Sequence, residues 1–141
     1  MSKKLGLGIL IVIALLIAYK TWGGYDNKSV DIPENLSAAV QFEEAQKNGQ
    51  PVWLMFGTNN CPYCVELKKI YDELKPQYEG KVVFIDVNLD KKENHDLGRE
   101  YQIRYVPVTC IYDKDGNITF YEGGLLEKEV LIRELDKVAL E

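Results

Sequence analysis

Residues 56–74 read FGTNNCPYCVELKKIYDEL, and they place two cysteines, Cys61 and Cys64, where a buried strand passes into a helix. A cysteine in the first turn of a helix meets unpaired backbone N–H groups and the positive end of the helix dipole, and both stabilise a thiolate. Pro62 suits that turn because its missing N–H would have had no partner there. The i, i+3 spacing brings the two sulfurs close enough for a disulfide across one turn.

This arrangement predicts a redox-active pair in which Cys61 is the attacking thiolate and Cys64 is the more buried resolving thiol. Attack on a substrate disulfide gives a mixed disulfide that Cys64 resolves, and the steps reverse in the oxidising direction. Two non-catalytic alternatives are a static disulfide and half of a metal site. A zinc site needs four ligands, but the sequence has no second CxxC and offers only His95 and Cys110 besides. We therefore expect no metal.

The elements on either side of the cysteines follow from the apolar pattern. Residues 51–57, PVWLMFG, form a short apolar run that predicts a buried strand, and Thr58–Asn60 is a polar turn with good N-cap residues. Beyond the cysteines, one face of the predicted helix carries Cys64, Leu67, Ile70 or Tyr71, and Leu74. This helix should end or bend at Pro76.

The rest of the chain alternates in the same way. We predict helices at 36–48, 93–101 and 126–140, strands at 81–88, 107–112 and 117–121, and a hairpin turn at Asp113–Gly116. Alternating strands and helices imply a parallel pair of strands, and the hairpin adds an antiparallel edge. The predicted fold is therefore α/β, with a central mixed sheet and helices on both faces.

The N-terminal segment is apolar and precedes the domain. Residues 5–19 are an unbroken apolar run, preceded by Lys3 and Lys4 and followed by Trp22. Residues 5–22 give about 27 Å of helix, near the lower limit for a membrane span. We predict residues 1–4 in the cytoplasm, an uncleaved signal anchor at 5–22, a linker at 23–33 and a domain at 34–141 outside the cytoplasmic membrane. A cleaved signal peptide and a buried core helix are the alternatives.

The charge of the chain argues against nucleic acid as a partner. The formal net charge is −5. From Tyr25 onward there are 14 basic and 22 acidic residues, a net charge of −8. An acidic domain repels phosphate backbones, so we expect no nucleic-acid binding. The simplest role of this charge is solubility.

Three stretches together resemble a known family. FGTNNCPYCVELKKIYDEL, KVVFIDVNLD and YQIRYVPVTCIYDKDGNITFYEGG are similar to the thioredoxin superfamily, over about residues 34–140. The lead-in AVQFEEAQKNGQPVWLMFG resembles that of exported, membrane-anchored bacterial thioredoxin-like proteins. The resemblance implies a thioredoxin-like fold and thiol–disulfide exchange on protein thiols and disulfides. It implies no bound cofactor. For a reductase it implies a membrane thiol-electron carrier as the partner that resets the redox state.

The same resemblance assigns residues around the cysteines. Pro107 matches the family's cis-proline, so Val106 and Pro107 would face the CxxC and the backbone of Val106 would pair with a substrate strand. The alternative is an ordinary trans proline that opens a strand. Tyr63 should be exposed beside the sulfurs, where it could contact a substrate peptide.

The chain also departs from the family pattern. Asn60 stands where a tryptophan is common, and Met55 stands where the family has a buried carboxylate that helps to move the proton of the resolving thiol. Asp86 is flanked by apolar Ile85 and Val87 on a strand that reads as buried. We hypothesise that Asp86, or a water beside it, takes over this proton transfer near Cys64. The alternative is an acid that points to solvent.

Two features leave the activity open. The Pro-Tyr dipeptide between the cysteines is found in many glutaredoxins, and it favours a less reducing pair, whereas the body of the sequence favours a reductase. A glutathione-dependent enzyme and a non-catalytic binding module with a structural disulfide are the two alternatives. Cys110 is expected to be a small buried core residue, with a regulatory thiol as its other interpretation.

Overall fold

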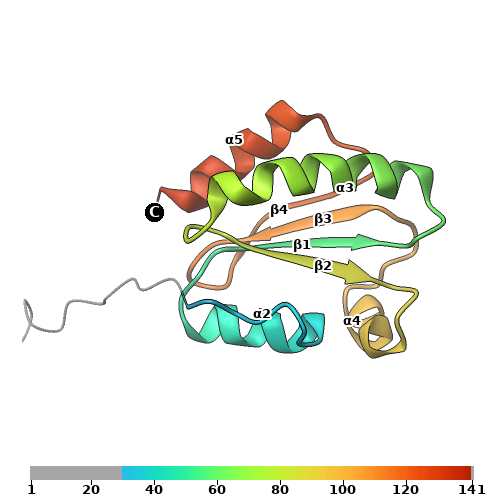
Figure 1. Ribbon diagram of the computed structural model, residues 1–141, viewed down its shortest axis with the longest axis horizontal. Helices are drawn as coiled ribbons and strands as arrows, with labels where there is room; N and C mark the ends of the chain where they lie inside the picture. Colours follow the sequence, from blue (N-terminus) through green and yellow to red (C-terminus); the bar gives the residue numbers. More distant parts are fainter. Residues whose placement is uncertain (1–29, 141) are drawn as a thin grey trace, which may run out of the picture.

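Four strands form one mixed sheet in the order β2–β1–β3–β4 (Figure 1). The structure is a computed structural model that describes residues 30–140. β1 (Val52–Gly57) runs parallel to β2 (Val83–Asn88) and antiparallel to β3 (Val108–Tyr112), and β4 (Ile118–Gly123) pairs antiparallel with β3 at the edge. The parallel pair and the antiparallel edge hairpin are as the sequence predicts.

Helices cover both faces of this sheet (Figure 1). α3 (Pro62–Leu74) and α5 (Lys128–Ala139) lie on one face, and α2 (Ala38–Lys47) and α4 (His95–Glu100) lie on the other. α3 passes at Leu74 into the 3₁₀ helix η1 (Lys75–Tyr78), because Pro76 cannot continue the α-helical hydrogen bonds. The predicted helix at 93–101 is split into η2 (Lys92–Asn94) and α4.

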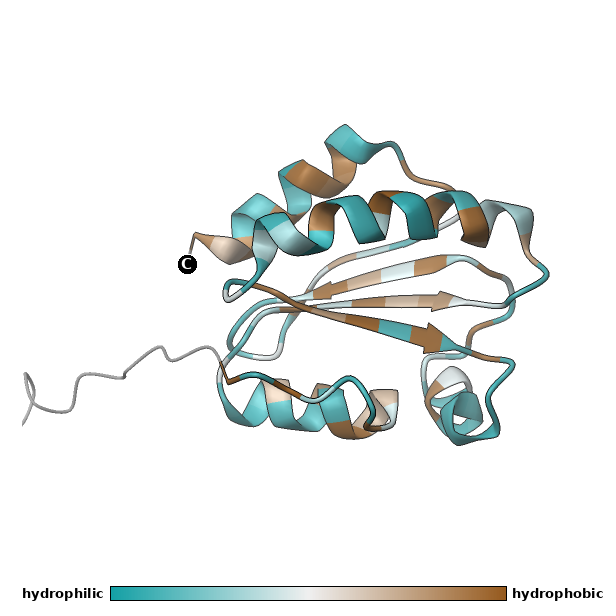
Figure 2. Cartoon of the chain, in the orientation of Figure 1, coloured by the Kyte–Doolittle hydropathy of each residue, from teal (hydrophilic) through white to brown (hydrophobic). Residues whose placement is uncertain are grey.

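Each face of the sheet has its own hydrophobic core. β1 is buried along its whole length, and its side chains alternate between the two cores. Trp53 and Met55 pack with α3 and α5, whereas Leu54 and Phe56 pack on the side of α2 and α4. Figure 2 shows the hydrophobic residues concentrated along the strands and on parts of the helices. The unbroken apolar run at 51–57 is thus explained by a strand that is covered on both faces.

The hairpin between β3 and β4 matches the turn chemistry of the sequence. In the β3–β4 hairpin, the Asp113 carboxylate accepts hydrogen bonds from the backbone N–H groups of Asp115 and Asn117, at 3.0 and 2.8 Å. Gly116 takes the left-handed conformation that closes the turn, with φ +83°.

The predicted anchor at 5–22 and its cytoplasmic flank at 1–4 lie outside the described residues, as does most of the linker at 23–33. Between residues 30 and 140, none of the helices has the length and apolar character needed to cross a membrane.

Candidate redox site

The two cysteines lie at the junction of β1 and α3. Cys61 is the N-cap of α3, and its sulfur accepts a hydrogen bond of 3.1 Å from the backbone N–H of Cys64. Pro62 occupies the first helical turn, as expected. The expected capping by Thr58–Asn60 is wrong, because the cap is Cys61 itself. The helix therefore directs a free N–H group and its positive end toward the sulfur that is expected to react.

Cys61 and Cys64 form a disulfide across this first turn, with their Cα atoms 5.1 Å apart. Cys64 is buried, whereas Cys61 is half-buried at the surface. Gly57 stands directly behind the second sulfur, where a Cβ would lie 3.5 Å from the Sγ of Cys64. The pair is thus asymmetric, with one sulfur reachable from solvent and the other shielded by the end of β1.

A loop from the other end of the sequence completes the site. The Val106–Pro107 peptide bond is cis, and the carbonyl oxygen of Val106 lies 3.7 Å from the Sγ of Cys61. The backbone N–H of Gly124 donates a 2.8 Å hydrogen bond to the carbonyl of Pro107. The fold therefore brings Val106 and Pro107 beside Cys61, and it joins this loop to Gly124, which directly follows β4. Tyr63 is 63% exposed at the same place, as the sequence predicts.

A hydrogen-bond network that the sequence reasoning missed holds the loop before Cys61. The Asp90 carboxylate accepts a 2.7 Å hydrogen bond from the backbone N–H of Asn59. The Asn88 side chain donates to the Asn59 side chain at 2.8 Å and accepts from the backbone N–H of Asp90 at 2.9 Å. The signal was present in the sequence, because residues that follow two adjacent parallel strands meet at the same edge of the sheet.

Asp86 is not buried, so the structure corrects the reason for singling it out. It pairs in register with Met55 on the neighbouring strand, but its side chain is 38% exposed. Lys68 of α3 lies 3.5 Å from the Asp86 carboxylate and 2.6 Å from that of Asp72. This exposure agrees with the alternative, an acid that points to solvent.

Asp86 nevertheless shares a pocket with the resolving cysteine. A hollow of about 310 Å³ opens between α3 and the ends of β1 and β2. Its walls include the charged side chains of Lys68, Lys69, Asp72 and Asp86 together with Met55, Gly57 and Cys64. Solvent in this pocket therefore has access to both the Asp86 carboxylate and the surroundings of Cys64.

Cys110 and His95 lie apart from the pair. Cys110 is fully buried in the core on the α2 side of the sheet, as expected. Burial raises the pKa of its thiol to about 11, although a hydrogen bond with Tyr112 acts in the opposite direction. His95 is exposed, and its Nε2 lies 3.0 Å from the carbonyl oxygen of Leu89. Among residues 30–140, no cluster of three or more His, Cys, Asp or Glu side chains could hold a metal ion.

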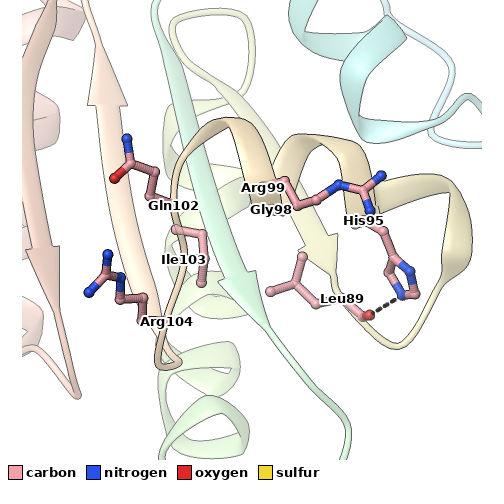
Figure 3. Close-up of a pocket in the computed structure, with 7 residues that line it drawn as sticks. All are labelled: Leu89, His95, Gly98, Arg99, Gln102, Ile103 and Arg104. Carbon is pink, nitrogen blue, oxygen red and sulfur yellow. Dashed lines mark hydrogen bonds between the residues drawn. The ribbon is translucent and has the colours of Figure 1, made fainter.

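A second pocket, of about 520 Å³, lies beside α4 (Figure 3). It is lined by Leu89, His95, Gly98, Arg99, Gln102, Ile103 and Arg104. Apart from His95, which the sequence offered as a possible zinc ligand, none of the residues singled out from the sequence lines it, and its lining contains no sulfur. The redox-active sulfurs of Cys61 and Cys64 therefore lie outside this pocket.

Three comparisons with known proteins point to the same family. A family model for a thioredoxin-like domain matches residues 38–139. Thioredoxin 1 of Nostoc sp. is 32% identical over 108 residues, which cover 72% of this chain and 98% of that protein. The solution structure of an uncharacterised thioredoxin-like protein from Clostridium perfringens superposes with a TM-score of 0.55 at 33% identity, covering 66% of this chain and 74% of that one.

A third relative is much longer than the matched region. The chloroplastic thioredoxin-like protein HCF164 of Arabidopsis thaliana is 26% identical over 110 residues, which cover 78% of this chain and 42% of that protein. The HCF164 protein of Oryza sativa is covered to 49%. The chain thus spans about half of the length of these two curated relatives.

Proposed function

The chain belongs to the thioredoxin-like domain family, and we propose that it reduces disulfides of protein clients by thiol–disulfide exchange, with Cys61 as the nucleophile and Cys64 as the resolving thiol. The domain is a thioredoxin-like oxidoreductase with a CxxC active site. The observation that carries the assignment of roles is the asymmetry of the pair. Cys61 is accessible at the N-terminus of α3, whereas Cys64 is buried one turn further on.

The reaction proceeds in two exchange steps. The Cys61 thiolate attacks one sulfur of the client disulfide, a bond forms between Cys61 and the client, and the other client sulfur leaves and takes up a proton. Cys64 then loses its proton and attacks the sulfur of Cys61, which releases the second client thiol. The client has gained two electrons and two protons, and the enzyme is left with the Cys61–Cys64 disulfide. A dithiol of a partner protein must return two electrons and two protons for the next cycle.

The surroundings of Cys61 favour its thiolate over its thiol. The backbone N–H of Cys64 already donates to the sulfur, and the dipole of α3, a helix of 13 residues, adds its positive end. Pro62 allows the helix to begin directly after Cys61, because its missing N–H would have had no partner within the helix. These contacts stabilise the anion that carries out the first attack.

The client would bind along the Val106–Pro107 loop. Neither Tyr105 nor Val106 donates its backbone N–H to another backbone group within the described residues. An extended client segment can therefore add to this free edge by backbone hydrogen bonds, with its cysteine beside Cys61. Tyr63, two residues after Cys61, is a further exposed aromatic residue near the reacting sulfur.

We assign to Asp86 the removal of the proton from Cys64 in the second step. The pocket that the two residues share supports this role, because a water in it can link a carboxylate to a thiol that lies beyond direct contact. The residue paired with Asp86 on the neighbouring strand is Met55, which cannot accept a proton. Lys68 lies between Asp86 and Asp72 and offsets the negative charge of the pocket.

We further propose that residues 5–22 anchor the protein in a membrane and that the domain works outside the cytoplasm, supplied with electrons by a membrane thiol carrier. This proposal is supported by the apolar run and by the two lysines before it. Nucleic acid is not part of the proposal, because the net negative charge of the domain repels phosphate backbones.

The experiment that tests the proposed function is a redox titration of the full chain with Cys110→Ala, equilibrated against glutathione buffers. A reduction potential of roughly −270 mV supports a reductase, and a value of roughly −120 mV would instead indicate a disulfide donor. A Cys64→Ser variant should accumulate a mixed disulfide through Cys61. If this variant, offered glutathione disulfide and a protein client together, formed its mixed disulfide mainly with glutathione, the result would favour the glutathione-dependent alternative. If the Cys61–Cys64 pair showed no reversible titration, the remaining interpretation would be a non-catalytic binding module with a structural disulfide.

A further inference from the structure

Tyr105 is a large aromatic residue that the fold leaves exposed next to the disulfide. It directly precedes Val106, whose carbonyl oxygen is 3.7 Å from the Sγ of Cys61. The residue is 64% exposed, and its hydroxyl group forms no hydrogen bond to any residue between 30 and 140. Neither core burial nor hydrogen bonding therefore explains the position of this ring.

The ring is instead seated in a space that Gly123 leaves free. A Cβ at Gly123 would overlap the Tyr105 ring, with the hydroxyl oxygen at 2.8 Å and Cζ at 2.9 Å. The two segments are also joined by the hydrogen bond from the backbone N–H of Gly124 to the carbonyl of Pro107. Tyr105 thus bridges the Val106–Pro107 loop and the end of β4, and it does so only because position 123 has no side chain.

This position lies along the free backbone edge where a client segment would pair. Side chains on a paired strand extend to either side of it, so a client residue close to the reacting cysteine would lie against the Tyr105 ring. An exposed aromatic ring contributes to binding mainly through apolar contact area, at a small cost in conformational entropy. Arg104, the preceding residue, is also exposed, but its side chain ends in a charge.

We propose that Tyr105, held over Gly123, is a specificity-determining residue that favours client segments with an apolar side chain next to their cysteine. The inference rests on the proposed exchange at Cys61 and adds to it the class of client. The contact with Gly123 fixes where the ring lies, and the proposed preference depends on that position.

The test compares two disulfide-linked peptides that are identical except for leucine or serine at the positions flanking the cysteine. For the full chain, kcat/KM for disulfide reduction should be higher with the leucine peptide. Tyr105→Ser should lower this preference by about fivefold, whereas Tyr105→Phe should keep it. Gly123→Ala should lower it to the same extent, because the new methyl group displaces the ring. The double variant Tyr105→Ser/Gly123→Ala should lose no more than either single variant.

A matched control is Ile118→Ser, which removes an exposed apolar side chain at the opposite end of β4 and should leave the preference intact. An unchanged leucine-to-serine ratio in Tyr105→Ser, or equal slowing of both peptides, would overturn the inference. Additive losses in the double variant would also count against it. A wild-type chain that reduces neither peptide nor a small aromatic disulfide would instead overturn the proposed function, and the inference with it.

Discussion

At the scale of single residues, Asp86 is an acid that shares a pocket with the resolving cysteine. Asp86→Asn keeps the shape of the side chain but removes the proton acceptor. The second exchange step should then slow on the order of tenfold at the pH values where Cys64 is still a thiol, which is less than the usual contribution of a general base because the carboxylate is solvent-exposed. The measurement is the pH profile, between pH 6 and 9, of the rate at which the Cys61 mixed disulfide is resolved.

The control for this prediction is Asp72→Asn. Asp72 binds the same lysine as Asp86, at 2.6 Å, and also lines the pocket. An effect transmitted through Lys68 would appear in both variants, whereas proton removal by Asp86 should appear in one. Identical pH profiles for Asp86→Asn and the parent chain would refute the assignment.

At the scale of secondary-structure elements, α5 depends on a buried acid. Glu134 is 6% exposed, and it accepts hydrogen bonds from Lys137 at 2.7 Å and from Arg133 at 3.0 Å. The hydrogen bond from Lys137 lowers the pKa of Glu134, burial opposes this, and Arg133 adds to the lowering. Because the folded pKa lies below the ordinary value of 4.5, the stabilisation is complete above that pH and is lost as the pH falls through the folded pKa.

Glu134→Gln should therefore lower the free energy of unfolding at pH 7 by about 1 kcal/mol, and the difference should shrink below pH 4. Urea denaturation followed by circular dichroism at pH 7 and at pH 3.5 measures both values. Glu129→Gln is the control, since Glu129 is an exposed acid on the same helix without an ion-pair partner among the described residues. A difference that stays constant down to pH 3.5 would contradict the role of the ion pair.

At the scale of the whole molecule, two cores share one sheet. Leu54 and Leu135 are both fully buried, one in the core beneath α2 and α4 and the other in the core beneath α3 and α5. Since β1 contributes alternate side chains to both cores, neither core can open without the strands that hold the other. We predict that Leu54→Ala and Leu135→Ala each lower the free energy of unfolding by about 2–5 kcal/mol.

Both variants should still unfold in one transition, with coincident denaturation curves from tryptophan fluorescence and circular dichroism and with an unchanged denaturant slope. Two separate transitions in either variant would mean that the faces fold independently.

The redox pair and the order of the elements could be predicted from the sequence because their causes are local. The spacing of Cys61 and Cys64, with Pro62 in the first turn of the helix, indicates a redox pair. The apolar periods identify β1 and the buried face of α3, and the Asp113–Gly116 turn identifies the hairpin. Each of these signals arises within a few residues of the chain.

Only the tertiary structure decided which distant residues surround the pair. Whether Asp86 is buried depends on how α3 crosses the sheet, and the contact of Val106 with Cys61 joins residues 45 positions apart. The Asn59–Asn88–Asp90 network and the seat of Tyr105 on Gly123 likewise depend on strand register. The physical reason is that sequence periodicity fixes the face on which a side chain lies, whereas only the packing of elements against one another fixes its neighbours.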